Sequence, residues 1–277
     1  MAARLACWRI VARSFQLFLL LFNRLLSLWL VSSLVWLAGN TAVLLGLAWM
    51  FESAGEPGLA PAWPAWLPPT VEGVLGAGVA GAVFVPFSIL LFRRVARDEP
   101  LPRNPLPLFL AARTWRFCAY GLALSLFYLL LTAGLAVALA ELRERLTPGA
   151  GASWAVVCAL GLAALWAMSR LAPLGLVFPA VALGDPAGFP RAWRLGRAQA
   201  WRVLFIQVLV WTPSQLAATA LQEYARTYLE GGVFSYGVGM GFMAFSLMLT
   251  LSLPTIALAL IYRDLTRPPA NAASTVA

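Results

Sequence analysis

The sequence lacks two residue types on which many enzymes depend. Its 277 residues include no histidine and no lysine, so all 20 basic residues are arginine. Without histidine there is no imidazole general base or metal ligand, and without lysine there is no Schiff-base chemistry. The three cysteines, Cys7, Cys118 and Cys158, fit neither a disulfide framework nor a zinc pattern. We therefore expect a protein that is not an enzyme and has no cofactor and no bound metal.

The sequence also has little charge. Charged residues make up 11% of the chain and hydrophobic residues 61%, with a mean hydropathy of +0.81. Soluble domains are about 25% charged and about 45–50% apolar. This composition predicts an all-α integral membrane protein. The net charge of +9 reflects membrane topology, so we expect no nucleic acid partner.

Six apolar runs are long enough to cross a bilayer, which requires about 20 helical residues. The fourth and sixth runs are longer than this and contain Pro173, Pro179 and Pro254, which predict kinks or a continuation of the helix in the membrane plane. The resulting six-span bundle covers 25–267, with spans near 25–49, 71–92, 117–140, 153–183, 203–222 and 233–262.

The distribution of arginine predicts the orientation of these spans. The two ends of the chain and the second and fourth connections, with Arg170 counted on their side, carry 17 of the 20 arginines and 4 of the 11 acidic residues. Cytoplasmic loops are enriched in arginine, so both termini are predicted to be cytoplasmic.

The two ends of the chain are predicted to lie outside the bilayer. Residues 1–24 are expected to form a cytoplasmic amphipathic helix, because Arg9, Arg13 and Gln16 fall at helical spacing and give it one polar edge. Residues 268–277 have no periodicity and are predicted to be a disordered tail.

Two connections share one arrangement of residues. Glu99 with Pro100 precedes Trp115 by 16 residues, and Asp185 with Pro186 precedes Trp201 by the same interval. In both, an arginine follows the tryptophan. The pattern suggests three parallel units, each with a surface helix and a two-span hairpin.

The fourth connection is the best-defined amphipathic element. Its apolar residues gather on one side of a helix while its arginines spread over the other, as expected for a helix at a membrane interface. Two interpretations remain open: the arginines only enforce topology, or they and the tryptophans bind a lipid headgroup or a partner. The candidate residues are Arg191, Trp193, Arg194, Arg197, Trp201 and Arg202.

Polar residues within the spans form a second candidate site, because such residues are costly in a bilayer. Arg170 would be deep in the membrane if the fourth span continued to Leu183, and interfacial if the helix broke at Pro173. The fifth span carries a polar stripe that fits either helix packing or a substrate pathway. Its residues are Gln207, Ser214, Gln215, Thr219 and Gln222, with Trp211 between them.

Residues 170–204, RLAPLGLVFPAVALGDPAGFPRAWRLGRAQAWRVL, and the later segment IYRDLTR resemble a bacterial inner-membrane family related to the membrane domain of glycerophosphodiester phosphodiesterases. The matching positions are Arg170, Pro179, Asp185, Trp193, Trp201, Arg202, Tyr262 and Asp264. The resemblance implies a bacterial cytoplasmic membrane location and a six-span plan. It does not imply phosphodiesterase activity, because that catalytic domain needs histidine and clustered acidic metal ligands.

Two functions follow as hypotheses. The first is a multi-pass inner-membrane protein that organises or modulates lipids or protein partners at the cytoplasmic leaflet, with anionic phospholipid as the expected ligand. The second is a small transporter or lipid-handling protein that uses Arg170 and the polar stripe. Small residues at four-residue spacing, such as Gly237 and Gly241, also allow an oligomer.

Overall fold

The computed structural model describes residues 6–53, 84–100, 106–145, 152–186, 188–228 and 233–266. Within these ranges every regular element is a helix and no residue lies in a strand, which confirms the predicted all-α class. The elements are α1 (Cys7–Ser53), a helix over residues 84–97, α3 (Leu106–Phe109), α4 (Ala112–Arg145), α5 (Ala152–Leu171), the 3₁₀ helix η1 (Ala172–Leu176), α6 (Val177–Leu183), α7 (Phe189–Gly196), the 3₁₀ helix η2 (Arg197–Gln199), α8 (Ala200–Tyr228) and α9 (Val233–Thr266).

Among the described residues, four helical stretches are long and apolar enough to cross a membrane. They are Ala112–Leu131, Gly161–Leu183, Phe189–Leu221 and Met248–Thr266. These overlap the third to sixth predicted spans, so the expected class of helical membrane protein is supported by length and composition. Most of the second predicted span, residues 71–83, and the predicted tail over 268–277 lie outside the described residues.

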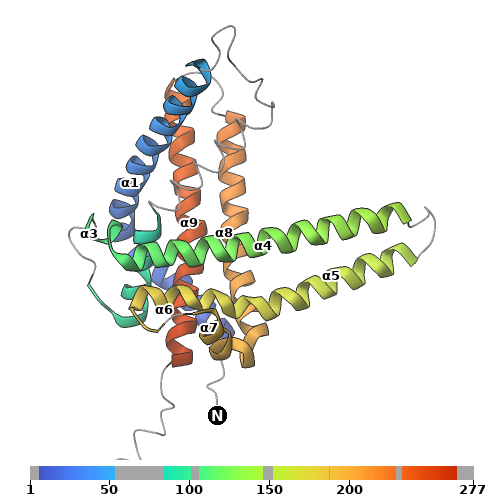
Figure 1. Ribbon diagram of the computed structural model, residues 1–277. Helices are drawn as coiled ribbons and strands as arrows, with labels where there is room; N and C mark the ends of the chain where they lie inside the picture. The colour runs from blue at the N-terminus through green and yellow to red at the C-terminus, as the bar shows by residue number, and fades with distance from the viewer. Residues whose placement is uncertain are drawn as a thin grey trace, which may run out of the picture.

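Helices α8 and α9 lie side by side and antiparallel, and their connected ends are at the top of Figure 1. The first part of α1 packs against both helices: the ring centroids of Trp8 and Phe205 are 6.2 Å apart, as are those of Phe22 and Phe245. The start of α1, the start of α8 and the end of α9 share the opposite end of the molecule. That end carries the basic segments predicted to be cytoplasmic.

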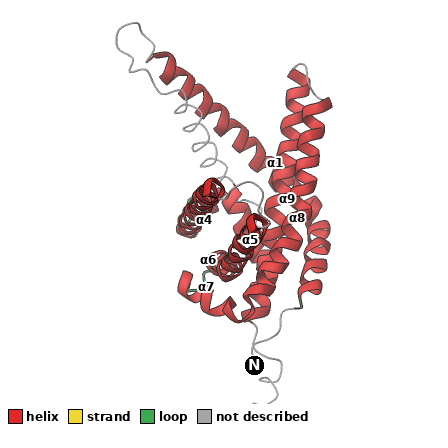
Figure 2. Ribbon diagram, turned by 90° about the vertical axis from the view of Figure 1, so that its right-hand side faces the viewer, coloured by secondary structure: helices red, strands yellow, loops and turns green. Residues whose placement is uncertain are grey.

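Helices α4 and α5 form a hairpin that runs crosswise to α8 and α9. Figure 1 shows the two helices projecting sideways, and Figure 2 shows them end-on while α8 and α9 stand upright. The described helices therefore do not all run parallel, as a simple six-span bundle would require. Periodicity along the chain indicates which segments are helical but not how a hairpin is directed.

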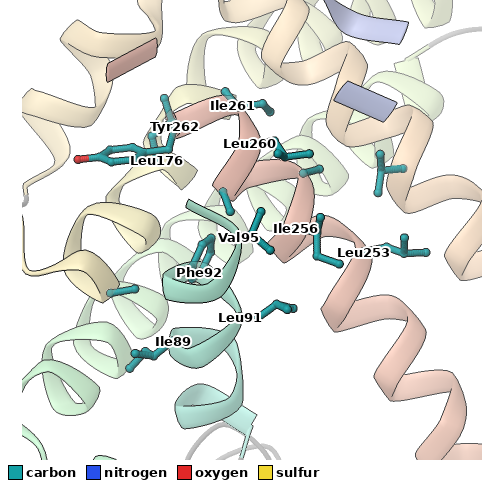
Figure 3. Packing of buried hydrophobic residues seen from close by; sticks show 14 of the residues in the cluster. Ile89, Leu91, Phe92, Val95, Leu176, Leu253, Ile256, Leu260, Ile261 and Tyr262 are labelled. Carbon is teal, nitrogen blue, oxygen red and sulfur yellow. The ribbon is translucent and has the colours of Figure 1, made fainter. Parts of the chain in front are cut away.

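The core surrounds the helix over residues 84–97, which enters it with a run of apolar side chains. Ile89 and Leu91 are fully buried, and almost every residue of 84–92 is buried, because this part of the helix is apolar on all sides. Figure 3 shows this helix packed against α9, where Ile256 and Leu260 are also buried. Leu176 of η1 closes the cluster from a third side.

Prolines shape the helices in different ways. Helix α5 ends at Leu171. The helical run continues through the tighter turn of η1, which has Pro173 at its second position, and into α6. Pro179 lies in the first turn of α6, where a missing N–H is tolerated. Pro254 lies inside α9, which remains one continuous helix.

Helix α1 is continuous from Cys7 to Ser53, without a break at the predicted boundary near residue 24. Its first part has the expected polar edge, because Arg9, Arg13 and Gln16 are exposed. The opposite side is buried against α8 and α9 rather than lying on a lipid surface; its residues include Ile10, Val11, Ser14, Phe18 and Leu21. The sequence alone did not show whether the apolar face of this helix packs against other helices or against lipid.

Large apolar side chains are exposed along four of the long helices in the described part of the chain, α1, α4, α5 and α8. On a soluble protein so large an apolar surface would be a liability, whereas a bilayer covers it. These residues include Leu122, Leu126, Leu129 and Leu130 of α4, Leu162 and Leu165 of α5, and Val208 and Leu216 of α8.

Candidate functional site

The site is built around the turn that follows α6. Gly184 ends this helix in a left-handed conformation with φ of 75°, which glycine adopts without the steric cost of a Cβ. The Gly184 N–H donates to the Val181 carbonyl at 3.1 Å, and the Asp185 N–H donates to the Ala180 carbonyl at 2.9 Å. The two bonds cap the helix and fix the direction of the Asp185 side chain.

Asp185 joins three segments of the chain. Arg97, at the end of the helix over residues 84–97, donates to Asp185 Oδ1 at 2.7 Å. Tyr262 of α9 donates to Asp185 Oδ2 at 2.8 Å. In Figure 3 the Tyr262 ring extends past Leu176, with its hydroxyl pointing away from the apolar cluster. Asp185 thus ties the α6–α7 turn to two helices that form the core.

The turn after residue 97 resembles the turn after α6. Asp98 has φ of 56° and stands immediately before Glu99 and Pro100, as Gly184 stands before Asp185 and Pro186. Asp98 is the single non-glycine residue with positive φ in the described part of the chain. Here Arg94 donates to the Asp98 carbonyl at 3.1 Å and Arg93 forms an ion pair with Glu99. The two predicted repeat units therefore share a local backbone feature as well as a residue pattern.

A large open groove lies beside the Asp185 turn, between the first turns of α4 and the segment from α6 to α7. Its volume is about 910 Å³. The lining combines an apolar surface with two arginines, Arg113 and Arg116, and one carboxylate, Asp185. The apolar lining comes from both sides: Ala119, Tyr120 and Ala123 of α4, and Val181, Pro186 and Phe189 of the facing segment.

Aromatic contacts hold the two sides of this groove together. The Tyr120 and Phe189 rings meet edge to face with centroids 5.2 Å apart. Phe117 and Phe178 lie deeper, with centroids 4.8 Å apart. Such pairs contribute about 0.5–1.5 kcal/mol each beyond their buried area. The groove is therefore a fixed part of the junction between α4 and α6.

The connector arginines predicted as a headgroup site are at the surface. Arg191, Arg194 and Arg197 are exposed, and Arg194 Nε donates to the Pro190 carbonyl at 3.4 Å. Arg202 and Trp193 are half-buried, and Trp201 is exposed. The amphipathic face is confirmed, because Ala192, Gly196 and Ala200 are buried behind these residues. The arginines lie outside the large groove.

The opposite face of α7 packs tightly on η1. A Cβ added at Gly196 would lie 2.7 Å from Pro173 Cβ and 3.0 Å from Leu176 Cδ1. Only a residue without a side chain fits this contact. The glycine thus explains how α7 remains close to the core while its arginines face outward.

Arg170 is in the last turn of α5, just before η1. Its side chain is exposed, and its guanidinium carbon lies 5.2 Å from the centroid of the Trp166 ring. The contact is a cation–π interaction. It does not decide between the two interpretations of Arg170, because Gly161–Leu183 forms one helical stretch long enough to cross a membrane. Arg170 does not line the large groove.

The residues of the polar stripe in the fifth span lie in different environments. Ser214 is buried and donates to the Trp211 carbonyl of its own helix at 2.7 Å. Gln207 and Gln215 are half-buried, and Thr219 is exposed. A Cβ at Gly175 would lie 3.4 Å from Gln207 Nε2, so Gln207 packs against η1. The Gln222 side chain lies outside the described residues. These contacts fit the packing interpretation of the stripe.

Two functional candidates were missed by sequence reasoning. Arg113 and Arg116 were counted only as topology signals, although they flank the start of α4 beside the groove. The Trp115-Arg116 pair repeats Trp201-Arg202, and this repetition was the available signal. Asp185 and Tyr262 are among the positions that match the membrane family, but the sequence did not predict that they are in contact.

Comparisons of the chain with models of protein families, with curated proteins and with solved structures found no match. The resemblance to the membrane domain of glycerophosphodiester phosphodiesterases therefore remains a prediction. The functional interpretation depends on the geometry of the groove and its charges.

Proposed function

We propose that this protein is a non-enzymatic, multi-pass protein of a bacterial cytoplasmic membrane that binds anionic phospholipid from the cytoplasmic leaflet. The observation that carries the proposal is the groove of about 910 Å³ between α4 and α6–α7, with Arg113 and Arg116 beside an apolar lining. Arginine matches the geometry of a phosphate group, and the apolar lining suits the acyl chains that accompany it.

The position of the groove supports the same assignment. It is formed by the start of α4 and the start of α7, two segments in the arginine-rich connections predicted to face the cytoplasm. The exposed Arg191, Arg194 and Arg197 of the neighbouring connector would attract anionic lipid to this surface, at about 1 kcal/mol for each arginine. The groove would then hold one lipid in a defined place.

The test compares two double variants with the same change in charge. Arg113→Gln with Arg116→Gln removes the arginines of the groove, and Arg194→Gln with Arg197→Gln removes two exposed arginines outside it. Each purified protein is reconstituted with phosphatidylglycerol and phosphatidylcholine, gently solubilised and weighed by native mass spectrometry. We expect a stoichiometric phosphatidylglycerol adduct on the wild type, a partly retained adduct on the control, and loss of the adduct from the groove variant. Equal retention by both variants would reject the proposal.

A further inference from the structure

A second cavity, of about 290 Å³, lies at the end of the helix over residues 84–97, away from the large groove. Three arginines from three separate helices line it: Arg13 of α1, Arg94 of the 84–97 helix and Arg263 of α9. Asp98 is the one carboxylate in the lining. Its size is near the lower limit for ligand pockets, which suits a small charged group.

Backbone contacts hold two of these arginines in place. Arg94 Nη1 donates to the Asp98 carbonyl at 3.1 Å, and Arg263 Nη1 donates to the Val95 carbonyl at 3.3 Å. A guanidinium carries five N–H donors, so one bond to a carbonyl orients the group and leaves Arg94 with donors for a ligand. The Arg263 side chain is 11% exposed, which strengthens its interactions with anions, and it already forms an ion pair with Asp264 at 3.9 Å.

The remaining lining is apolar and comes mostly from α1, with Val95 of the 84–97 helix. Leu17, Leu20 and Leu21 of α1 follow Arg13 along the helix, and Leu20 is among the most exposed apolar residues of the protein. Among the described residues that line the cavity, three arginines face one carboxylate, and the pairing of Arg263 with Asp264 leaves Arg13 and Arg94 to favour an oxyanion. Leucines next to the arginines extend the cavity toward the apolar surface.

From these contacts we infer a second anion site that binds a phosphate group, with Arg13 and Arg94 as its principal donors. A phosphate could come from a lipid headgroup or from a soluble phosphate compound, and the two sources share the same recognition by guanidinium groups. The site uses none of the residues of the large groove, so it stands independently of the proposed function.

The experiment uses the full chain carrying Arg113→Gln and Arg116→Gln, so that the large groove does not contribute. Arg13→Gln removes a charge from the cavity, and Arg9→Gln removes an exposed arginine one helical turn earlier that does not line it. Asp98→Asn removes the single carboxylate while keeping a residue type that tolerates positive φ. Binding of phosphatidic acid is counted by native mass spectrometry, and binding of inorganic phosphate is followed by calorimetry.

We expect Arg13→Gln to weaken binding about fivefold, Asp98→Asn to tighten it by a similar factor, and Arg9→Gln to leave it unchanged. Misfolding would lower the affinity, so it cannot explain a gain of affinity in Asp98→Asn. That gain would therefore show that the cavity binds the anion even if Arg13→Gln lost binding through misfolding. Effects on phosphatidic acid alone would identify a lipid headgroup, and effects on inorganic phosphate would identify a soluble ligand. Equal binding by Arg13→Gln and Arg9→Gln, with no change in Asp98→Asn, would overturn the inference.

Discussion

The Tyr262 hydroxyl donates a hydrogen bond to the Asp185 carboxylate at 2.8 Å, across 77 residues of sequence. Tyr262 is 4% exposed and its ring belongs to the core, whereas its hydroxyl reaches the turn beside the large groove. The carboxylate also accepts from Arg97. One side chain therefore fixes the position of the groove relative to α9.

Removal of the Asp185 carboxylate is expected to destabilise the protein more than removal of either donor. Asp185→Ala leaves the buried Tyr262 hydroxyl without its acceptor, at a cost of about 1–3 kcal/mol. Tyr262→Phe should cost about 1 kcal/mol, and Arg97→Gln less than about 1 kcal/mol because that pair is partly exposed. Thermal unfolding in mild detergent, followed by circular dichroism, measures the order of the three variants. Arg97→Gln as the most destabilised variant would contradict this account.

The close contact between α7 and η1 predicts that Gly196 cannot be enlarged. In Gly196→Ala the new methyl would meet Pro173 at 2.7 Å, and the rigid proline ring cannot move aside. Overpacking of this kind costs about 1–3 kcal/mol. Gly161→Ala in α5 is the matched control, because nothing lies within 4 Å of its added Cβ and alanine favours the helix. The difference between the two unfolding midpoints tests the contact; equal midpoints would show that α7 is free to shift.

Substitution of Gly184 is expected to change stability only through the backbone conformation at this position. No atom lies within 4 Å of a Cβ added there, but φ of 75° disfavours other residues. Gly184→Ala should cost about 1 kcal/mol, and Gly184→Asn less, because asparagine tolerates the left-handed region. The same unfolding assay compares the two variants. An alanine variant as stable as the asparagine variant would mean that the turn relaxes to another conformation.

Much of the helical structure could be predicted from local sequence. The 3₁₀ turn at Pro173, the amphipathic face of α7 and the polar edge at the start of α1 all depend on residues close together in the chain. Proline chemistry and helical periodicity act over one or two turns, so they can be recognised without a structure.

The relationships between distant segments could not be predicted in this way. The bond between Asp185 and Tyr262 and the groove between α4 and α7 depend on how helices pack, which periodicity does not specify. The crosswise direction of the α4–α5 hairpin has the same origin. Arg113 and Arg116 looked like topology signals because their neighbours across the groove lie about seventy residues further along the chain.

The exposed arginines of the α7 connector are expected to act by general electrostatic attraction. Arg191→Gln, Arg194→Gln and Arg197→Gln together should weaken the attraction of anionic lipid to this surface by about 3 kcal/mol at low salt. Stability should hardly change, because all three side chains are exposed. The measurement is the enrichment of labelled phosphatidylglycerol around the protein in nanodiscs at two salt concentrations. An enrichment that does not depend on salt would contradict screening of surface charges.

The α4–α5 hairpin provides a test of membrane topology. Helix α4 contains a stretch long and apolar enough to cross a bilayer, and another such stretch begins in α5 and continues through η1 and α6. The exposed leucines of α4 and α5 require an apolar environment. The arginine distribution predicts that the connection between them, residues 146–151, faces away from the cytoplasm. A single cysteine placed by Thr147→Cys, with the native cysteines replaced by serine, should then react with a membrane-impermeant maleimide in intact spheroplasts. A control cysteine introduced by Arg197→Cys, in the predicted cytoplasmic connector, should react only after permeabilisation. If Thr147→Cys also required permeabilisation, the hairpin would not cross the bilayer and would lie across the α8–α9 pair at the cytoplasmic side, in the direction seen in Figure 1.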